Sequence, residues 1–299
     1  MNTSPFYAKK LGSLISSHSW SGKVISVHAE AINIIYPGEL LVSLLKNHAD
    51  MTALGIEVPS LFKEKECLPV LEASVEMHRE RLTISTGVSV LVIDLSNAPV
   101  WEGALKEKDL RCFTRDKLFL LIDALLREGK PGGFLGLISG DFDSPFVRKA
   151  WQLLSHIQEE KYRNKRPILR SISTLIGLGV GYTPSGDDFL TGVMLGERII
   201  SLKGKDLSPS LSVFPLIPLD EISNGLGRTN PAGRSILFPA IRGHFPQYLL
   251  DLLKDTARAE DLGDIRRAIR KAVAHGETSG TDSVSGLCWY MEKVLLKNI

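Results

Sequence analysis

Two short segments of the chain place hydroxyl side chains, a glycine and aspartates in the same order. The first runs from Gly181 to Asp188 (GYTPSGDD) and the second from Gly276 to Asp282 (GETSGTD). With one gap at Pro184, and followed on to Gly192 and Gly286, both fit the pattern G-x-T-S-G-x-D-x-x-[ST]-G. Threonine and serine are preferred at helix N-caps, so each segment is expected to open a helix. This repeat is the strongest internal signal in the sequence.

The aspartates of the repeat are the candidate catalytic residues. Asp187, Asp188 and Asp282 are expected in the first helical turns, where the helix dipole favours negative charge by about 0.3–1 kcal/mol. One of them could act as a general base, or they could hold a divalent cation such as Mg²⁺, which prefers oxygen ligands. Capping of the two helices alone would also account for them. We expect the two segments to converge, with Asp188 and Asp282 lining one cavity.

Glycines near the two helix starts need a separate explanation, because a glycine within a helix costs up to about 1 kcal/mol relative to alanine. Gly192 and Gly196, four residues apart, would let another helix approach closely. Gly186 and Gly280 fall in first turns, where backbone N–H groups have no partner within the helix, and we expect these groups to bind a small anion. The predicted substrate-binding residues of the repeat are Gly181, Thr183, Ser185, Gly186, Thr278, Ser279 and Gly280.

Three further side chains are candidates for contact with the same anionic substrate. Arg228 and Arg234 lie in a polar segment that is predicted to be a loop, and a guanidinium group binds carboxylate or phosphate through two hydrogen bonds. His275 stands directly before the second segment, and histidine titrates near neutral pH. A surface turn for the arginines and a cation at a helix C-terminus for His275 are the alternatives without a binding role.

The elements that must position these residues fall into a β-rich part, 1–105, and a mainly helical part, 106–299. The predicted fold class is therefore α+β. The boundary is placed where alternating and β-branched patterns give way to the helical period.

In the β-rich part, the segment Val24–Tyr36 is rich in β-branched residues and ends at a Pro-Gly turn signal. Leu82–Leu95 is expected to form two strands broken at Gly87. The second of these strands is almost continuously apolar, and we expect it to be buried on both faces. Helices are predicted at 5–17 and 39–47, and the latter segment is equally compatible with a strand.

In the helical part, the apolar period predicts a helix over 116–128 with Leu118, Leu121, Ile122 and Leu125 on one face. Ser144 before Pro145 marks another helix start. The apolar stripe predicted for that helix is Val147, Ala150, Trp151, Leu154 and Ile157. Further helices are predicted at 168–176, 184–202, 247–255, 264–274 and 279–297, with a long loop from Asp206 to Pro218.

Composition excludes several classes of function. The 299 residues carry 36 basic and 34 acidic side chains, so bulk charge gives no case for nucleic-acid binding. No stretch approaches the roughly 20 apolar residues that span a bilayer, and the N-terminus lacks the features of a signal peptide. The three cysteines, Cys67, Cys112 and Cys288, are scattered without metal-binding spacing, which is typical of reduced thiols in the cytoplasm.

At the two segments the sequence resembles a bacterial family that includes the AllH subunit of oxamate carbamoyltransferase. The resemblance rests on Leu178–Leu190 and His275–Asp282, with weaker support from Gly22–Val24 and Asp94–Trp101. It implies a role, with other subunits, in splitting oxalurate into oxamate and carbamoyl phosphate during anaerobic allantoin degradation. The family supplies no established catalytic residues, so the site residues above come from the repeat itself.

Gly186–Gly192 also fits the G-D-x-F-x-x-G of ribokinase-like sugar kinases, although the doubly wound fold of those enzymes is not expected here. Three functions therefore stay open. The first is an enzyme or enzyme subunit that acts on a small anionic substrate by carbamoyl transfer. The second is a phosphotransferase whose helix start resembles that of the sugar kinases. The third is a non-catalytic binding or assembly subunit.

Overall fold

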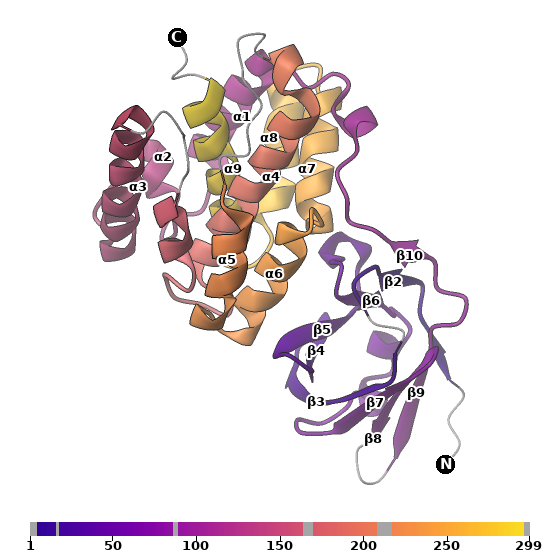
Figure 1. Ribbon diagram of the computed structural model, residues 1–299. Helices are drawn as coiled ribbons and strands as arrows, with labels where there is room; N and C mark the ends of the chain where they lie inside the picture. Colours follow the sequence, from indigo (N-terminus) through magenta and orange to yellow (C-terminus); the bar gives the residue numbers. More distant parts are fainter. Residues whose placement is uncertain (1–4, 16–17, 86–88, 164–169, 208–216, 296–299) are drawn as a thin grey trace. The chain divides into compact units, whose positions relative to one another are not determined.

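The computed structural model describes residues 5–15, 18–85, 89–163, 170–207 and 217–295. The chain divides into two compact units, Met1–Gly103 and Ala104–Ile299, each with its own core (Figure 1). The first is built from strands and the second mainly from helices, which confirms the predicted α+β class.

The first unit is a mixed, mainly antiparallel sheet. Its strand order is β1-β9-β8-β7-β3-β4-β5-β6-β2-β10. Their bounds are β1 (Phe6–Tyr7), β2 (Lys10–Gly12), β3 (Trp20–Val27), β4 (Ala31–Tyr36), β5 (Leu40–Leu45), β6 (Gly55–Glu57), β7 (Ser74–His78), β8 (Arg81–Ser85), β9 (Val90–Asp94) and β10 (Val100–Trp101). The sheet is strongly curled, because β1 pairs with β9 while β2, which follows it closely, pairs with β6 (Figure 1).

The concave core of this sheet is aliphatic. It includes Val24, Ile34, Leu44, Ile56 and Ile84, all fully buried. Around Val24 in β3 and Ile84 in β8, buried residues alternate with more exposed ones, which is the period-2 pattern of strands that are buried on one face. The strands β5 and β6 are buried almost throughout.

Two expectations for this unit are wrong. The described part of the predicted helix 5–17, residues 5–15, contains β1 and β2 instead, because its backbone pairs with β9 and β6. The strand β9 alternates between buried and exposed positions, with Val90 50% exposed and Ile93 buried, so it is not covered on both faces. Segment 39–47 contains β5, the strand alternative, and the two predicted strands of 82–95 are β8 and β9, with Gly87 outside the described residues.

The second unit is a helical array. Its α-helices are α1 (Arg115–Glu128), α2 (Gly136–Ser139), α3 (Pro145–Arg163), α4 (Ser185–Leu207), α5 (Leu219–Gly225), α6 (Pro231–Ile241), α7 (Gln247–Arg258), α8 (Leu262–Val273) and α9 (Ser279–Leu295). Short 3₁₀ helices include η5 (Arg170–Leu175) and η6 (Leu226–Arg228). The central pair is α4 and α9, with α6 against α4 and with α1 and α8 against α9 (Figure 1).

Two glycines allow α4 and α9 to approach closely. A Cβ at Gly192 would overlap the carbonyl oxygen of Ser283, and one at Gly286 would overlap the carbonyl oxygen of Phe189. The two helix starts meet where Oγ1 of Thr183 lies 2.9 Å from Oγ of Ser279, and further along a Cβ at Gly196 would meet the ring of Tyr290. The helices α4 and α9 therefore run in the same direction with their N-termini at one end. Every residue of α4 from Ser185 to Gly196 is buried, as expected for a helix surrounded by other helices.

Most predicted helices are confirmed, with four differences. The described part of the predicted helix 168–176 is the 3₁₀ helix η5. Trp151 is 50% exposed, while Val147, Ala150 and Leu154 of the same predicted stripe are buried and the side chain of Ile157 lies outside the description. The predicted Arg228–Arg234 loop becomes helix from Pro231, because Asn230 caps α6 by accepting a hydrogen bond from the Gly233 N–H at 2.8 Å. Most of the Asp206–Pro218 loop lies outside the described residues, although α4 extends to Leu207.

We expect Gly286→Ala to destabilise the helical unit by about 1–3 kcal/mol, because the added methyl group would push α4 and α9 apart. Gly227→Ala is the matched control, since a Cβ there meets no atom within 4 Å. Thermal unfolding of both variants measures the effect. Equal melting temperatures for Gly286→Ala and the wild type would contradict the close packing.

Candidate functional site

The first segment ends in a tight turn into α4. The N–H groups of Asp187 and Asp188 both donate to the carbonyl oxygen of Pro184, at 2.9 and 3.3 Å. The Thr183 hydroxyl donates to Oδ2 of Asp188 at 2.8 Å, so the predicted cap residue contacts a carboxylate rather than only backbone. Both aspartates are almost fully buried, with Asp188 1% exposed and Asp187 0%.

The second segment enters α9 in the same way, and the two helix starts meet. The Asp282 N–H donates to the carbonyl oxygen of Thr278 at 2.8 Å. Oγ1 of Thr183 lies 2.9 Å from Oγ of Ser279, which joins the two segments directly. Asp282 is fully buried, and its charge contributes to the raised pKa of Asp188. The predicted convergence of the two segments is therefore observed.

The contacts around the two carboxyl groups are reciprocal. Asp188 is hydrogen-bonded by Thr183 of its own segment and by Ser279 of the other. Asp282 is hydrogen-bonded by Thr278 of its own segment and by Ser185 of the other. Each serine thus crosses to the carboxyl group of the opposite helix, which gives the pair an approximate twofold relation.

Burial dominates the electrostatics of this pair. It raises the pKa of Asp188 well above the usual range, and the hydroxyl hydrogen bonds oppose the shift while the charges of Asp282 and Asp187 add to it. Burial also raises the pKa of Asp282, against hydrogen bonds from the Phe134 N–H, Ser185 and Thr278. One oxygen of each group, Oδ1 of Asp188 and Oδ2 of Asp282, is buried without a hydrogen-bond partner among the described residues.

Asp187 has a different environment from its neighbour. Its Oδ1 accepts from the Gly177 N–H at 2.9 Å, and its Oδ2 accepts from the Thr229 hydroxyl. Gly233 of α6 also lies against this carboxyl group, since a Cβ there would overlap Oδ2 of Asp187. Asp187 therefore connects α4 both to the loop that contains Gly177 and to the start of α6. Both oxygens are occupied, so this arrangement indicates a structural role.

The expectation of unpaired N–H groups at Gly186 and Gly280 is wrong. The Gly186 N–H donates to the carbonyl oxygen of Leu178 at 2.7 Å, and the Gly280 N–H donates to that of His275 at 3.0 Å. A Cβ at Gly186 would overlap the carbonyl oxygen of Leu175, and one at Gly280 would overlap that of Ala272. Both glycines therefore serve the close approach of a preceding turn, and not an exposed anion site.

Within the described part of the chain, the hydrogen bonds of Arg228 and Arg234 go to backbone carbonyl oxygens and not to the carboxyl groups of Asp188 and Asp282. Arg228 donates to the carbonyl oxygen of Ser173 at 2.6 Å. Arg234 donates to those of Leu226 and Thr229, at 3.2 and 3.4 Å. Among the described residues no arginine or lysine contributes to the pKa shifts of the three aspartates. Arg234 is linked to the site through Thr229, whose hydroxyl donates to Asp187.

His275 lies at the edge of the site, next to Tyr248, which was not among the residues predicted for the site. Its ring stacks on Tyr248 of α7 with centroids 4.2 Å apart. The Tyr248 hydroxyl lies 3.0 Å from Oγ of Ser283, and the charges of Asp188 and Asp282 help raise its pKa. Tyr248 therefore faces the carboxyl pair, although nothing in its sequence context marked it.

The segment 129–134, between α1 and α2, completes the second helix start. The Phe134 N–H donates to Oδ1 of Asp282 at 2.5 Å, and the Lys130 N–H donates to Oγ1 of Thr281 at 3.0 Å. The Lys130 ammonium donates to the carbonyl oxygen of Gly276 at 2.7 Å. In the sequence this segment is marked only by its Pro-Gly-Gly turn. Its part in the site was hard to predict because it donates backbone N–H groups, which do not depend on particular side chains.

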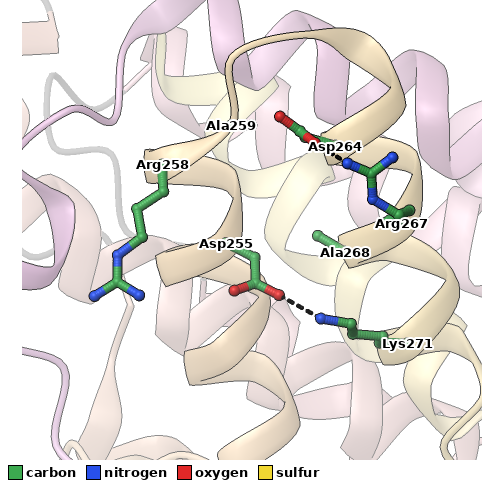
Figure 2. A pocket seen from close by; sticks show the side chains of 7 residues that line it. All are labelled: Asp255, Arg258, Ala259, Asp264, Arg267, Ala268 and Lys271. Carbon is green, nitrogen blue, oxygen red and sulfur yellow. Dashed lines mark hydrogen bonds and ion pairs between the residues drawn. The ribbon is translucent and has the colours of Figure 1, made fainter.

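No group of three or more His, Cys, Asp or Glu side chains suited to a metal occurs among the described residues. Asp188, Asp282 and the neighbouring hydroxyls could offer oxygen ligands, so a bound Mg²⁺ stays a hypothesis. A charged hollow between α7 and α8 lies elsewhere (Figure 2), and there Asp255 pairs with Lys271 at 2.9 Å and Asp264 with Arg267. These side chains largely neutralise one another, so the carboxyl pair remains the candidate site.

Comparison with known proteins identifies one family. Residues 175–291 match the family described as "Oxamate carbamoyltransferase subunit AllH", which confirms that this segment is AllH-like. The match contains both helix starts but not Lys130 or Phe134. No match was found among curated proteins or solved structures. Within the described residues, no helix combines the length and apolar character needed to cross a membrane.

The pKa of Asp187 predicts a pH-dependent contribution to stability. Burial raises it from 3.8 to about 6, so the folded state binds this proton more tightly than the unfolded state does. The resulting stabilisation is complete below about pH 4 and is lost as the pH rises through about 6. Relative to the wild type, Asp187→Asn should therefore gain up to about 3 kcal/mol between pH 4 and pH 8.

Denaturant unfolding of both proteins across this pH range measures the difference. The asparagine can keep both hydrogen bonds, so the change isolates the charge. A difference in unfolding free energy that does not vary with pH would rule out a buried, titrating Asp187.

Proposed function

We propose that this AllH-like chain is a subunit of a carbamoyltransferase and acts on a small anionic substrate at the paired starts of α4 and α9. The family match supports the reaction class, carbamoyl transfer between oxalurate or oxamate and phosphate in allantoin catabolism. The substrate would lie against the three segments that meet at the carboxyl pair, which are 129–134, 177–183 and 275–279. Other subunits of the enzyme would complete the active site.

The observation that carries the proposal is the pair of buried carboxyl groups, each with one oxygen that has no hydrogen-bond partner among the described residues. A carboxyl group whose pKa is raised by burial is suited to general acid–base work, because it can hold a proton at a pH where an ordinary aspartate is ionised. Two parallel helix N-termini also create a positive potential at this end of the unit. That potential favours anionic substrates even without free N–H donors.

The candidate catalytic residues are therefore Asp188 and Asp282, with Asp187 supporting them. Thr183, Ser185, Thr278 and Ser279 would orient the two carboxyl groups rather than bind substrate directly. Exposed Gly181 and partly buried His275 and Lys130 lie at the ends of the three segments, where a substrate would first make contact. Arg228 and Arg234 would act indirectly, Arg234 by holding Thr229 and Arg228 by holding the backbone at Ser173.

A non-catalytic assembly subunit is the second candidate. It is favoured by two exposed apolar side chains next to the site, Val180 at 67% and Tyr182 at 53% exposure. Such residues on a glycine-rich loop suit contact with another protein. In that case the carboxyl pair would only stabilise the fold.

Steady-state activity of the enzyme reconstituted with its other subunits tests the proposal. Asp188→Asn should lower kcat by about 10²–10⁴-fold, because the amide keeps the shape of the side chain but cannot exchange a proton. Asp220→Asn, at an exposed position in the first turn of α5, is the matched control and should retain activity.

Assembly and folding must be followed in the same samples, by sedimentation and thermal unfolding. Full activity in a correctly assembled Asp188→Asn enzyme would exclude a catalytic role for this carboxyl group and favour the assembly subunit.

A further inference from the structure

We infer that Thr183 and Ser279 form a relay of two hydroxyl groups, which carries protons between the buried carboxyl group of Asp188 and a substrate at the surface. The inference rests on the proposed function, because it concerns how Asp188 would act on that substrate. It gives the two hydroxyls a second task besides orienting the carboxyl group. It also assigns the proton transfer to Asp188 rather than to Asp282.

The burial of Asp188 is the reason that a relay is needed. The residue is 1% exposed, so a substrate outside the helices has no direct access to its carboxyl oxygens. A general acid or base must lie within about 2.6–3.2 Å of the proton that it moves, or be joined to it by a bridging group. Thr183 and Ser279 are both only partly buried, and their hydroxyls can therefore connect the carboxyl group to the surface.

The three groups lie within hydrogen-bond distance in series. The Thr183 hydroxyl donates to Oδ2 of Asp188 at 2.8 Å, and its Oγ1 lies 2.9 Å from Oγ of Ser279. Because the single hydrogen of the Thr183 hydroxyl points at Asp188, Ser279 is the donor of the second bond. A hydroxyl donates and accepts at once, so a proton gained on one side can be released on the other. Ser279 is also placed to hydrogen-bond with Asp188 itself, which gives the relay a shorter branch.

The relay balances the protons of the proposed transfer. A phosphate oxygen bonds to the carbamoyl carbon while the bond from that carbon to the leaving nitrogen breaks. Monohydrogen phosphate gives its proton to Ser279, whose own proton passes to Thr183, while that of Thr183 passes to Asp188. The reverse sequence delivers a proton to the leaving nitrogen. Asp188 ends the turnover in the protonation state in which it began, so no outside acid or base is required.

Asp282 has surroundings that suit a supporting role. The Phe134 N–H donates to its Oδ1 at 2.5 Å, and a Cβ at Gly133 would overlap both of its carboxyl oxygens. The backbone of the segment 129–134 therefore lies directly against this carboxyl group. Ser185, which corresponds to Ser279 on this side, is only 6% exposed, so the serine that bonds to Asp282 is buried.

Steady-state kinetics and thermal unfolding of the enzyme reconstituted with its other subunits test the relay. Thr183→Val keeps the shape of the side chain but removes the hydroxyl, and it should lower kcat by about 10²-fold with little change in KM. Thr183→Ser keeps the hydroxyl and should restore most of the lost kcat. Thr83→Val, at a partly buried threonine of β8 in the first unit, is the matched control and should retain full activity.

A second variant covers the case in which Thr183→Val does not fold. Ser279→Ala leaves the bond between Thr183 and Asp188 in place, and it should lower kcat by at least about tenfold, because the outer hydroxyl of the relay is lost. A Thr183→Ser enzyme as slow as Thr183→Val would mean that the methyl group is needed and not the hydroxyl, which would overturn the relay. Full kcat in a folded Thr183→Val/Ser279→Ala double variant would overturn it as well.

Two further outcomes separate the relay from the claims around it. Thr278 is the partly buried counterpart of Thr183 beside Asp282, and Thr278→Val should lower kcat much less than Thr183→Val does. Equal losses would overturn the assignment of the proton transfer to Asp188. An inactive Asp188→Asn enzyme beside a fully active double variant would remove the relay and leave the proposed function, whereas an active Asp188→Asn enzyme would remove both.

Discussion

The close, parallel contact of α4 and α9 is the constraint on which the site depends. Gly192 and Gly286 let each helix rest on the other's backbone, at the carbonyl oxygens of Ser283 and Phe189. Two helices that run in the same direction at this distance must begin side by side. Their first turns, which carry Asp188 and Asp282, are thereby brought into one buried volume, and any side chain larger than hydrogen at the two glycines would separate them.

The remaining features of the site follow from placing two carboxyl groups there. Both side chains are at most 1% exposed, so the segments themselves must supply hydrogen bonds, and they do so through hydroxyls that cross from one helix start to the other. The segment 129–134 contributes backbone N–H groups to α9, while Asp187 is used on the side of α4 to anchor Gly177 and Thr229. What is left over is one oxygen on each carboxyl group. The proposed chemistry depends on the two carboxyl groups.

The sequence predicted the helix starts and their convergence because a repeated Thr-Ser-Gly-x-Asp pattern has few other uses. It also led to the AllH-like resemblance, which the family match confirms. It could not predict that Gly186 and Gly280 pack against carbonyl oxygens, since a glycine in a first turn fits a ligand and a close backbone equally well. Tyr248 and Phe134 were missed because one acts through tertiary placement and the other through its backbone. The wrong helix at 5–17 has a similar cause, because strand pairing with β6 and β9 outweighed its local pattern.

A double-mutant cycle in the free energy of unfolding, with Asp188→Asn, Asp282→Asn and the double variant at pH 8, tests most directly whether the two helix starts form one site. Two carboxyl groups that are buried together must respond jointly to substitution. We therefore expect the effect of the double variant to differ from the sum of the single effects by about 0.5–3 kcal/mol. Effects that add to within about 0.3–0.5 kcal/mol would mean that the two aspartates are independent caps of separate helices, and would contradict the composite site.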